Sequence, residues 1–179
     1  SRDLGDFEQA EEFAMDGLKL ARELGDRYLI AYSYESLGLI QRGLSNYPVA
    51  INTLNRAIES AEDQKSMYQL GRYEASLGVV WADAGDPARG LSMVDMACER
   101  LQLIDATNEL DRARLFRAWV CYLKGDITSA EALLDQQRLE RDIIYEALMI
   151  REGTRMQPLL AHVAKNADKK AAIPPVLKQ

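Results

Sequence analysis

The sequence predicts an all-α protein built as an array of antiparallel helix pairs. The first observation behind this prediction is a short, corner-like segment that recurs every 40 residues, beginning at positions 5, 45, 85 and 125. The second is that apolar residues between these segments recur at every third or fourth position, as on one face of a helix. An internal period of this length is typical of stacked helical repeats, in which neighbouring units bury a continuous core.

Each recurring segment has the chemistry of a helix–turn–helix corner. A small residue can take the left-handed conformation that ends one helix, and the following Asp or Asn can accept hydrogen bonds from the N–H groups that begin the next. Pro87 suits the first helical position, and a small residue four positions after the cap allows the two helices to pack closely. The segments are Gly5-Asp6-Phe7 with Ala10, Ser45-Asn46-Tyr47 with Ala50, Gly85-Asp86-Pro87 with Gly90, and Gly125-Asp126-Ile127 with Ala130.

Residues 1–25 are expected to form only the second half of a repeat. Asp6 is predicted to cap a helix whose apolar face contains Phe13, Leu18 and Ala21. The first helix of this unit is absent from the sequence, and a repeat cannot bury its inner face alone. We therefore expect further repeats upstream in a longer protein.

Repeats are predicted at residues 27–63, 67–103 and 107–139, and only the first two of these are expected to be full units. In the first of them, Leu37 and Gly38 precede the corner, and Leu54 and Ala57 follow it on one helical face. The other two repeats keep the same plan, with Ala118 in place of the glycine in the last one. Each repeat should therefore be one antiparallel helix pair.

The pattern changes towards the C-terminus. After Leu134 the period weakens, because Gln137 and Arg138 stand where earlier repeats have small or apolar residues. Residues 140–166 are predicted to be capping helices that cover the open end of the stack. Residues 167–179, which contain two adjacent prolines, are predicted to be an extended tail or a linker to a further domain. Docking of this tail on the array as a peptide is an open alternative.

Two of the repeats resemble the tetratricopeptide repeat, whose pattern runs Leu-Gly, an aromatic residue, Gly-Asp-Tyr and Ala. The matching residues are Leu37, Gly38, Asn46, Tyr47 and Ala50, then Leu77, Gly78, Gly85, Asp86 and Gly90. The period of 40 residues exceeds the usual unit of about 34. It is similar to the long repeats of kinesin-light-chain-like arrays and of bacterial signalling regulators of the maltose-activator type. The resemblance implies a right-handed superhelix of helix pairs.

The chain lacks the first tryptophan of the tetratricopeptide pattern. The corresponding positions of its three repeats are Tyr34, Glu74 and Arg114. An array of the HEAT or armadillo kind, whose period is also about 40 residues, is an alternative. Those repeats do not need a Gly-Asp-aromatic corner followed by a small residue. The corners therefore favour the tetratricopeptide interpretation.

Composition and charge narrow the classes of function. The chain is 47% hydrophobic and 28% charged, and no apolar run reaches the about 18 residues that a membrane span needs. The N-terminus lacks a basic-then-apolar leader pattern, so a cytoplasmic location is expected. Cys98 and Cys121 are predicted to be free thiols in helices. The net charge of −6 argues against direct nucleic-acid binding, which needs clustered Lys and Arg.

The sequence offers few groups for catalysis. His162 is the only histidine, so a Ser–His–Asp triad or a histidine-rich metal site would depend on one residue near the end of the chain. A phosphate-binding loop is not predicted, because the corner glycines are followed by aspartates, whose charge would repel a phosphate. We predict no enzyme activity, no cofactor and no metal.

Function is therefore expected on the surface that stacking creates. In tetratricopeptide arrays the first helix of each unit lines a concave groove. The positions that the resemblance implies here are Tyr32, Glu35, Ser36, Leu39, Arg42, Arg72, Ala75, Val79, Asp83, Arg112, Leu115, Phe116, Trp119 and Tyr122. Arg42, Arg72 and Arg112 recur on one stripe, which predicts a bound peptide of acidic character. For the apolar residues of the last repeat, packing against neighbouring helices is an open alternative.

The sequence supports three hypotheses about function. The leading one is a protein-interaction and regulatory module of a larger, bacterial signalling or transcription-regulating protein, which binds a peptide or protein segment in the groove. The second is a sensor domain whose superhelix receives a small molecule or a signalling peptide. The third is a self-association scaffold, a homo-oligomer formed through an end face of the array or through the proline-containing tail.

Overall fold

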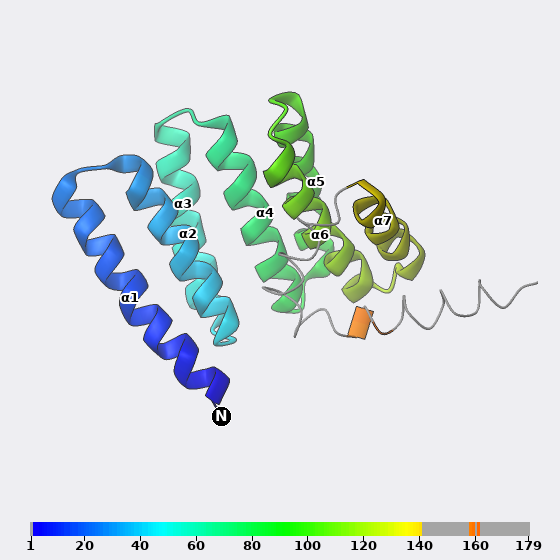
Figure 1. The fold of residues 1–179 in the computed structure, drawn as a ribbon, viewed down its shortest axis with the longest axis horizontal. Coiled ribbons are helices and arrows are strands. Elements are labelled where there is room, and N and C mark those ends of the chain that lie inside the picture. Colours follow the sequence, from blue (N-terminus) through cyan, green and yellow to red (C-terminus); the bar gives the residue numbers. More distant parts are fainter. Residues whose placement is uncertain (1, 141–157, 160, 162–179) are drawn as a thin grey trace, which may run out of the picture.

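The computed structural model describes residues 2–140, 158–159 and 161. Between residues 2 and 140 the chain forms seven α-helices joined by short turns (Figure 1). The helices are α1 (Arg2–Leu24), α2 (Arg27–Gly43), α3 (Tyr47–Asp63), α4 (Met67–Asp83), α5 (Pro87–Leu103), α6 (Thr107–Lys124) and α7 (Ile127–Glu140). The prediction of an all-α array of helix pairs is confirmed.

The helices are arranged in two layers. Each helix packs against the next one along the chain, and α4 also packs against α2 and α6. The helices α2, α4 and α6 therefore form one layer, which we call the inner layer, and the helices that follow them form the other. Figure 1 shows the helices side by side in chain order, with α1 at one end of the stack.

The turns within residues 2–140 share one conformation. Each contains a residue with a positive φ, and these residues recur every 20 positions: Gly25, Ser45, Lys65, Gly85, Asp105 and Gly125. The predicted corners at 45, 85 and 125 are confirmed as turns. Asp86 and Asp126 act as predicted and accept hydrogen bonds from N–H groups at 3.0 and 3.1 Å, whereas Asn46 makes no side-chain capping bond.

The first predicted corner is wrong. Helix α1 begins at Arg2 and runs without a break to Leu24, so Gly5 and Asp6 lie inside it and Asp6 is not a cap. A corner forms where the chain reverses onto a helix that it can pack against, and residues 2–4 provide no such helix. The backbone therefore stays helical, although glycine disfavours a helix by about 1 kcal/mol relative to alanine.

Small residues bring the two helices of a pair into close contact. A Cβ atom placed on Gly90 of α5 would lie 2.6 Å from the carbonyl oxygen of Gly78 on α4. A Cβ atom on Gly38 of α2 would lie 2.6 Å from Cγ of Leu54 on α3, and Ala50 of α3 is fully buried. The prediction that small residues after the corners allow close packing is confirmed for these two pairs.

The apolar period continues at one position beyond α7. Residues 158–159 and 161 are helical, and Leu159 is fully buried in the same apolar cluster as Val79 and Trp119. Leu159 follows Trp119 by one period of 40 residues, as Trp119 follows Val79. The weakened pattern after Leu134 did not indicate this continuation.

The rest of the C-terminal region lies outside the described residues. This applies to most of the predicted capping helices at 140–166, to the tail at 167–179 and to His162. The division of the chain into array, cap and tail stays a prediction.

Candidate partner-binding surface

The inner layer gathers most of the predicted groove residues into two polar clusters. The first, which we call the Glu35 cluster, contains Glu35, Tyr68, Arg72, Ser76, Glu109 and Arg112. The second, the Asp83 cluster, contains Arg42, Asp83, Phe116, Trp119 and Tyr122. Each cluster joins α2, α4 and α6.

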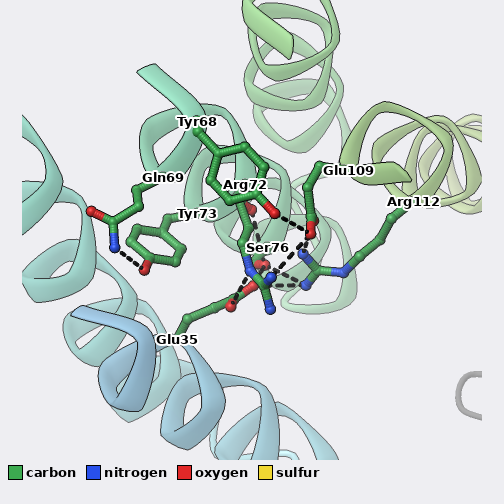
Figure 2. Close-up of polar contacts among 8 residues, drawn as sticks. All are labelled: Glu35, Tyr68, Gln69, Arg72, Tyr73, Ser76, Glu109 and Arg112. Carbon is green, nitrogen blue, oxygen red and sulfur yellow. Dashed lines mark hydrogen bonds and ion pairs between the residues drawn. The ribbon is translucent and has the colours of Figure 1, made fainter. Parts of the chain in front are cut away.

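At the centre of the Glu35 cluster, one buried carboxylate accepts hydrogen bonds from two other helices. Glu35 is 1% exposed, and its Oε2 accepts from Arg72 Nε at 2.6 Å. Its Oε1 accepts from Ser76 Oγ and from Arg112 Nη2, each at 2.8 Å. Figure 2 shows the Glu35 side chain reaching from α2 towards the two arginines.

A second carboxylate completes the cluster from the far side. Glu109 Oε1 accepts from Arg72 Nη1 at 3.0 Å and from the Tyr68 hydroxyl at 2.9 Å. Glu109 Oε2 accepts from Arg112 Nη1 at 3.4 Å. Two arginines therefore share two glutamates, and the four side chains have no net charge (Figure 2).

The pKa shifts of Glu35 and Tyr68 favour the protonation states that their hydrogen bonds require. Burial raises the pKa of the Glu35 carboxyl, but the nearby Arg112 and Arg72 and the hydrogen bond from Ser76 outweigh burial and hold the pKa below its ordinary value. Burial and the Glu109 carboxylate raise the pKa of the Tyr68 hydroxyl. At neutral pH, Glu35 is therefore an acceptor and Tyr68 a donor, as the hydrogen bonds require.

The Asp83 cluster is built in the same way around another carboxylate. Asp83 Oδ2 accepts from Arg42 Nε at 2.7 Å, and Asp83 Oδ1 accepts from Trp119 Nε1 at 2.7 Å. The Arg42 guanidinium also lies 5.8 Å from the centre of the Phe116 ring, and Trp119 stacks on Tyr122 with ring centres 5.6 Å apart. The cluster ties α2 to α4 and α4 to α6.

Several of the predicted apolar groove positions are buried. Leu115, Phe116 and Trp119 are buried in the apolar cluster that extends from α4 to α7, as are Ala75 and Val79. These side chains therefore pack against neighbouring elements, and their role in a groove stays a prediction. Ser36 and Leu39 are half-buried.

The arginine stripe has a different environment from the one that the sequence suggested. Each of the three arginines donates to a carboxylate of this same chain: Arg42 to Asp83, and Arg72 and Arg112 to Glu35 and Glu109. A carboxylate arriving from a peptide would compete with partners already within hydrogen-bond distance. The prediction of a peptide of acidic character is therefore not supported by these contacts.

Three tyrosines form an exposed surface beside the Glu35 cluster. Tyr28, Tyr32 and Tyr68 are 49, 42 and 37% exposed, and we call them the tyrosine edge. The Arg72 guanidinium lies 5.1 Å from the centre of the Tyr32 ring, and Tyr68 donates to Glu109. Sequence reasoning found only Tyr32. The 40-residue spacing of Tyr28 and Tyr68, at the start of α2 and of α4, is the pattern that could have found the other two.

Other kinds of site were sought in the same residues. In the part of the chain that the structure describes, no three His, Cys, Asp or Glu side chains are grouped to hold a metal ion. The helices described here lack the combination of length and apolarity that crossing a membrane requires. Cys98 and Cys121 are free thiols, as predicted, and burial raises the pKa of Cys98 to about 11. An open pocket of about 440 Å³ is lined by residues of α2 and α3, among them Arg27, Tyr34 and Arg56.

Comparison with known proteins agrees with this architecture. The sequence pattern of the tetratricopeptide repeat matches residues 1–63. The crystal structure of BtubC (BKLC) from P. vanneervenii is similar, with 15% identity, a TM-score of 0.63, and coverage of 96% of this chain and 77% of BtubC. The apo form of RapI is similar at 12% identity and a TM-score of 0.65, with 92% of this chain covered and 64% of RapI. Among curated proteins, no sequence matches this chain.

These likenesses define the class of fold. Two solved structures superpose on more than nine-tenths of the chain, and the repeat pattern matches its N-terminal third. The chain has the fold of these two solved structures, and its residues 1–63 match the tetratricopeptide repeat pattern that the sequence resembles. It spans less than two thirds of the length of RapI.

Proposed function

We propose that this chain is a protein-interaction module that binds a peptide or protein segment on its inner layer, along the tyrosine edge. The observation that carries the proposal is the exposure of Tyr28, Tyr32 and Tyr68 beside a fully paired network of charged side chains. No enzyme activity, cofactor or nucleic-acid partner is proposed.

The tyrosine edge has the physical properties of a binding hot spot. A tyrosine offers a large, amphipathic contact area and loses little conformational entropy, because its side chain has only two torsions. Tyr32 lies against Arg72, and Tyr68 is held by Glu109, so both rings are oriented before a partner arrives. Preorganisation of this kind lowers the entropic cost of binding.

The charge balance supports a partner of a particular chemistry. Arg72 and Arg112 are neutralised by Glu35 and Glu109, so the floor beneath the tyrosines has no excess positive charge. An uncharged segment with aromatic or aliphatic side chains and free hydrogen-bonding groups would gain more from this surface than an acidic segment. The partner class is therefore an apolar or aromatic peptide segment.

A peptide selection tests this proposal. A phage-displayed library of random peptides is selected on the chain, and the selected peptides are measured by fluorescence anisotropy against the wild type, Tyr32→Ala and Tyr68→Ala. Loss of a hot spot of about 2 kcal/mol predicts binding weaker by about 30-fold. Leu103→Ala, which truncates a residue 79% exposed on α5, is the matched control and should bind as the wild type does. Equal binding to all four proteins would place the site elsewhere.

The biological setting is a further part of the proposal. The resemblance of the long repeats to bacterial signalling regulators supports a role in a larger, cytoplasmic signalling or transcription-regulating protein. The sensor and self-association hypotheses stay predictions. A thermal-shift screen with metabolites tests the sensor, because a ligand that binds only the native state raises the unfolding midpoint.

A further inference from the structure

Two arginines from different helices converge on one neutral side chain, that of Tyr34. Arg22 of α1 donates a hydrogen bond to the Tyr34 hydroxyl oxygen at 2.6 Å, and its guanidinium lies 5.7 Å from the centre of the ring. The guanidinium of Arg56, on α3, lies 6.0 Å from the same ring centre. Tyr34 belongs to α2, so three helices contribute to this place, which we call the Tyr34 site.

The Tyr34 site lies in a groove between helices. Both α1 and α3 pack against α2, but within residues 2–140 they do not pack against each other. Helix α2 is therefore the floor of a groove that has α1 and α3 as its walls. The open pocket of about 440 Å³ lies in this groove, and its lining includes Ile30, Tyr34 and Arg56. Its volume is within the range of about 300 to 1,000 Å³ that is usual for small-molecule sites.

The equivalent groove two repeats further along is also open. A pocket of about 380 Å³ lies over α6, and its lining includes Gln102, Leu110 and Arg114. These residues follow Arg22, Ile30 and Tyr34 by two periods of 40 residues. Helix α4, which precedes α5 along the chain, is present in the structure and leaves this pocket open. The opening at the Tyr34 site is therefore a property of the repeat, and it does not arise because α1 is the first helix.

In the other two repeats the position of Tyr34 carries a charge that has a partner. Glu74, one period after Tyr34, accepts two hydrogen bonds from Arg100 of α5, at 2.9 and 3.0 Å. Arg114, two periods after Tyr34, forms an ion pair with Asp111 at 3.5 Å. These two grooves therefore balance their charges with side chains of the chain itself.

At the Tyr34 site the positive charges are not balanced in this way. In the part of the chain that the structure describes, neither Arg22 nor Arg56 forms an ion pair with a carboxylate. Among the same residues, the Tyr34 hydroxyl accepts from Arg22 but donates to none. Burial raises the pKa of Tyr34, but the hydrogen bonds and charges of Arg22 and Arg56 outweigh burial and hold the pKa below its ordinary value. The local potential therefore favours a bound anion.

The donors of the Tyr34 site match a phosphate monoester. The two guanidinium groups supply two positive charges and planar sets of N–H donors, which suit phosphate and carboxylate oxygens. A phosphate monoester carries about −1.5 to −2 charges at neutral pH and three acceptor oxygens, whereas a carboxylate carries one charge and two oxygens. With the Tyr34 hydroxyl as a third donor, phosphate uses the site more completely than a carboxylate does.

Acidic side chains line another part of the same pocket. Glu59 and Asp63 lie three and seven positions after Arg56, on one face of α3. At a rise of about 1.5 Å per residue, Asp63 is about 10 Å from Arg56 along the helix axis. Carboxylates accept hydrogen bonds from ammonium and hydroxyl groups. A ligand that carries such a group a short distance from its phosphate would therefore satisfy both parts of the pocket.

We propose that the Tyr34 site binds the phosphate of a small phosphate monoester that also carries an amino or hydroxyl group. Arg22 and Arg56 donate to the phosphate oxygens, the Tyr34 hydroxyl donates to one of them, and Glu59 accepts from the amino or hydroxyl group. Tyr32 and Tyr34 are two positions apart on α2, so they project from different sides of the helix. The Tyr34 site is therefore separate from the tyrosine edge and does not depend on the function proposed for that edge.

Three small probes test the proposal in ¹H–¹⁵N NMR titrations of the chain. They share a two-carbon amine and differ in the anion: O-phosphoethanolamine has a phosphate, β-alanine has a carboxylate, and ethanolamine has neither. O-Phosphoethanolamine should bind at least about 10-fold more tightly than β-alanine, and ethanolamine should show no saturable binding. The amide signals of residues 22, 34 and 56 should shift on binding of O-phosphoethanolamine.

Substitutions of the donors should weaken binding to different extents. Arg22→Gln and Arg56→Gln should each weaken binding of O-phosphoethanolamine by at least about 10-fold, because each removes charge-assisted hydrogen bonds. Tyr34→Phe removes one neutral donor and should weaken it by about 3-fold. Arg89→Gln is the matched control, since Arg89 is an exposed arginine of α5 that also lies over an aromatic ring, 3.8 Å from the ring centre of Trp81. This variant should bind as the wild type does.

Several outcomes would overturn the proposal. These are the absence of saturable binding of O-phosphoethanolamine, unchanged affinity in Arg22→Gln and Arg56→Gln, and an equal loss in Arg89→Gln, which would indicate general charge attraction. Equal affinity for β-alanine would refute the preference for phosphate. Tighter binding of a phosphoserine peptide would assign the site to a phosphorylated protein segment instead. Tyr32→Ala should leave binding of O-phosphoethanolamine unchanged, so a failure at the tyrosine edge and a failure at the Tyr34 site give different results.

Discussion

Helices α1 and α5 occupy the same position in the repeat but have opposite surroundings. On α5, Ala97, two periods after Gly17, is fully buried, and Gly90 approaches Gly78 of α4 so closely that even one methyl group would have to displace backbone. On α1, Gly17 has open space around it, and the large apolar residues nearby are exposed. The comparison teaches that the period places the small residues, whereas the neighbouring helices decide whether those residues are packed.

The largest effect should come from the centre of the inner layer. Glu35→Gln removes the charge that Arg72 and Arg112 share, and breaking a buried ion pair destabilises a protein by about 3 to 5 kcal/mol. We therefore expect the free energy of unfolding, measured in urea, to fall by about 3 kcal/mol. The control is Asp95→Asn, which breaks a half-exposed pair with Arg117 and should cost less than about 1 kcal/mol. Equal losses would mean that the Glu35 cluster does not hold the layer together.

The same variant should also change the response to acid. Because the pKa of Glu35 is lowered in the folded chain, its charge stabilises the fold above the unfolded-state pKa of about 4.3 and loses this effect as pH falls through the folded-state value. The stability difference between wild type and Glu35→Gln should therefore shrink below about pH 4.3. Urea unfolding over a pH series measures this stability difference. A difference that grows as the pH falls would contradict a lowered pKa for Glu35.

A smaller loss is expected at the contact between α4 and α5. In Gly90→Ala the added Cβ lies 2.6 Å from the carbonyl oxygen of Gly78 and 3.1 Å from the backbone nitrogen of Ala82, so the two helices must separate. Overpacking of this kind costs about 1 to 3 kcal/mol, more than alanine gains in helix propensity. We expect a net loss of about 1 to 2 kcal/mol by thermal or urea unfolding. An unchanged stability would show that the pair can relax without loss.

The smallest effect should have the opposite sign. Gly17→Ala places a methyl group in open space inside an exposed helix, so the gain in helix propensity should raise stability by about 0.5 to 1 kcal/mol. Urea unfolding beside Gly90→Ala gives the matched comparison, since the two substitutions are chemically the same. Destabilisation by Gly17→Ala would show that a neighbouring element already occupies this space.

The fold could be predicted from sequence to the extent that it depends on local chemistry. The turns at 45, 85 and 125 were found because a small residue and a polar or Pro-containing helix start coincide there. The turns at Lys65 and Asp105 lie in the gaps between the predicted repeats, although neither residue is a glycine and a positive φ is uncommon outside glycine. At Gly5 the corner residues are present and the turn is absent, since residues 2–4 belong to the same helix as Gly5.

The sequence predicted which residues lie on the candidate surface, but not which side chains of the chain pair with one another there. The resemblance placed Glu35, Arg72 and Arg112 on one surface, and they do meet. The ion pairs join residues 37 and 77 positions apart, not 40 or 80, so they depend on the stagger between α2, α4 and α6. The sequence therefore predicted that the arginines bind an acidic peptide. In the structure they are paired with carboxylates of the same chain.

By itself the sequence determined the helices, their pairing and the spacing of small residues, because helix periodicity, capping and glycine conformation are local properties. Only the tertiary structure decided which arginines are neutralised and which groove residues are buried. These features depend on the relative positions of several helices. A one-dimensional period repeats residue types, but it does not specify how far one helix is shifted against the next.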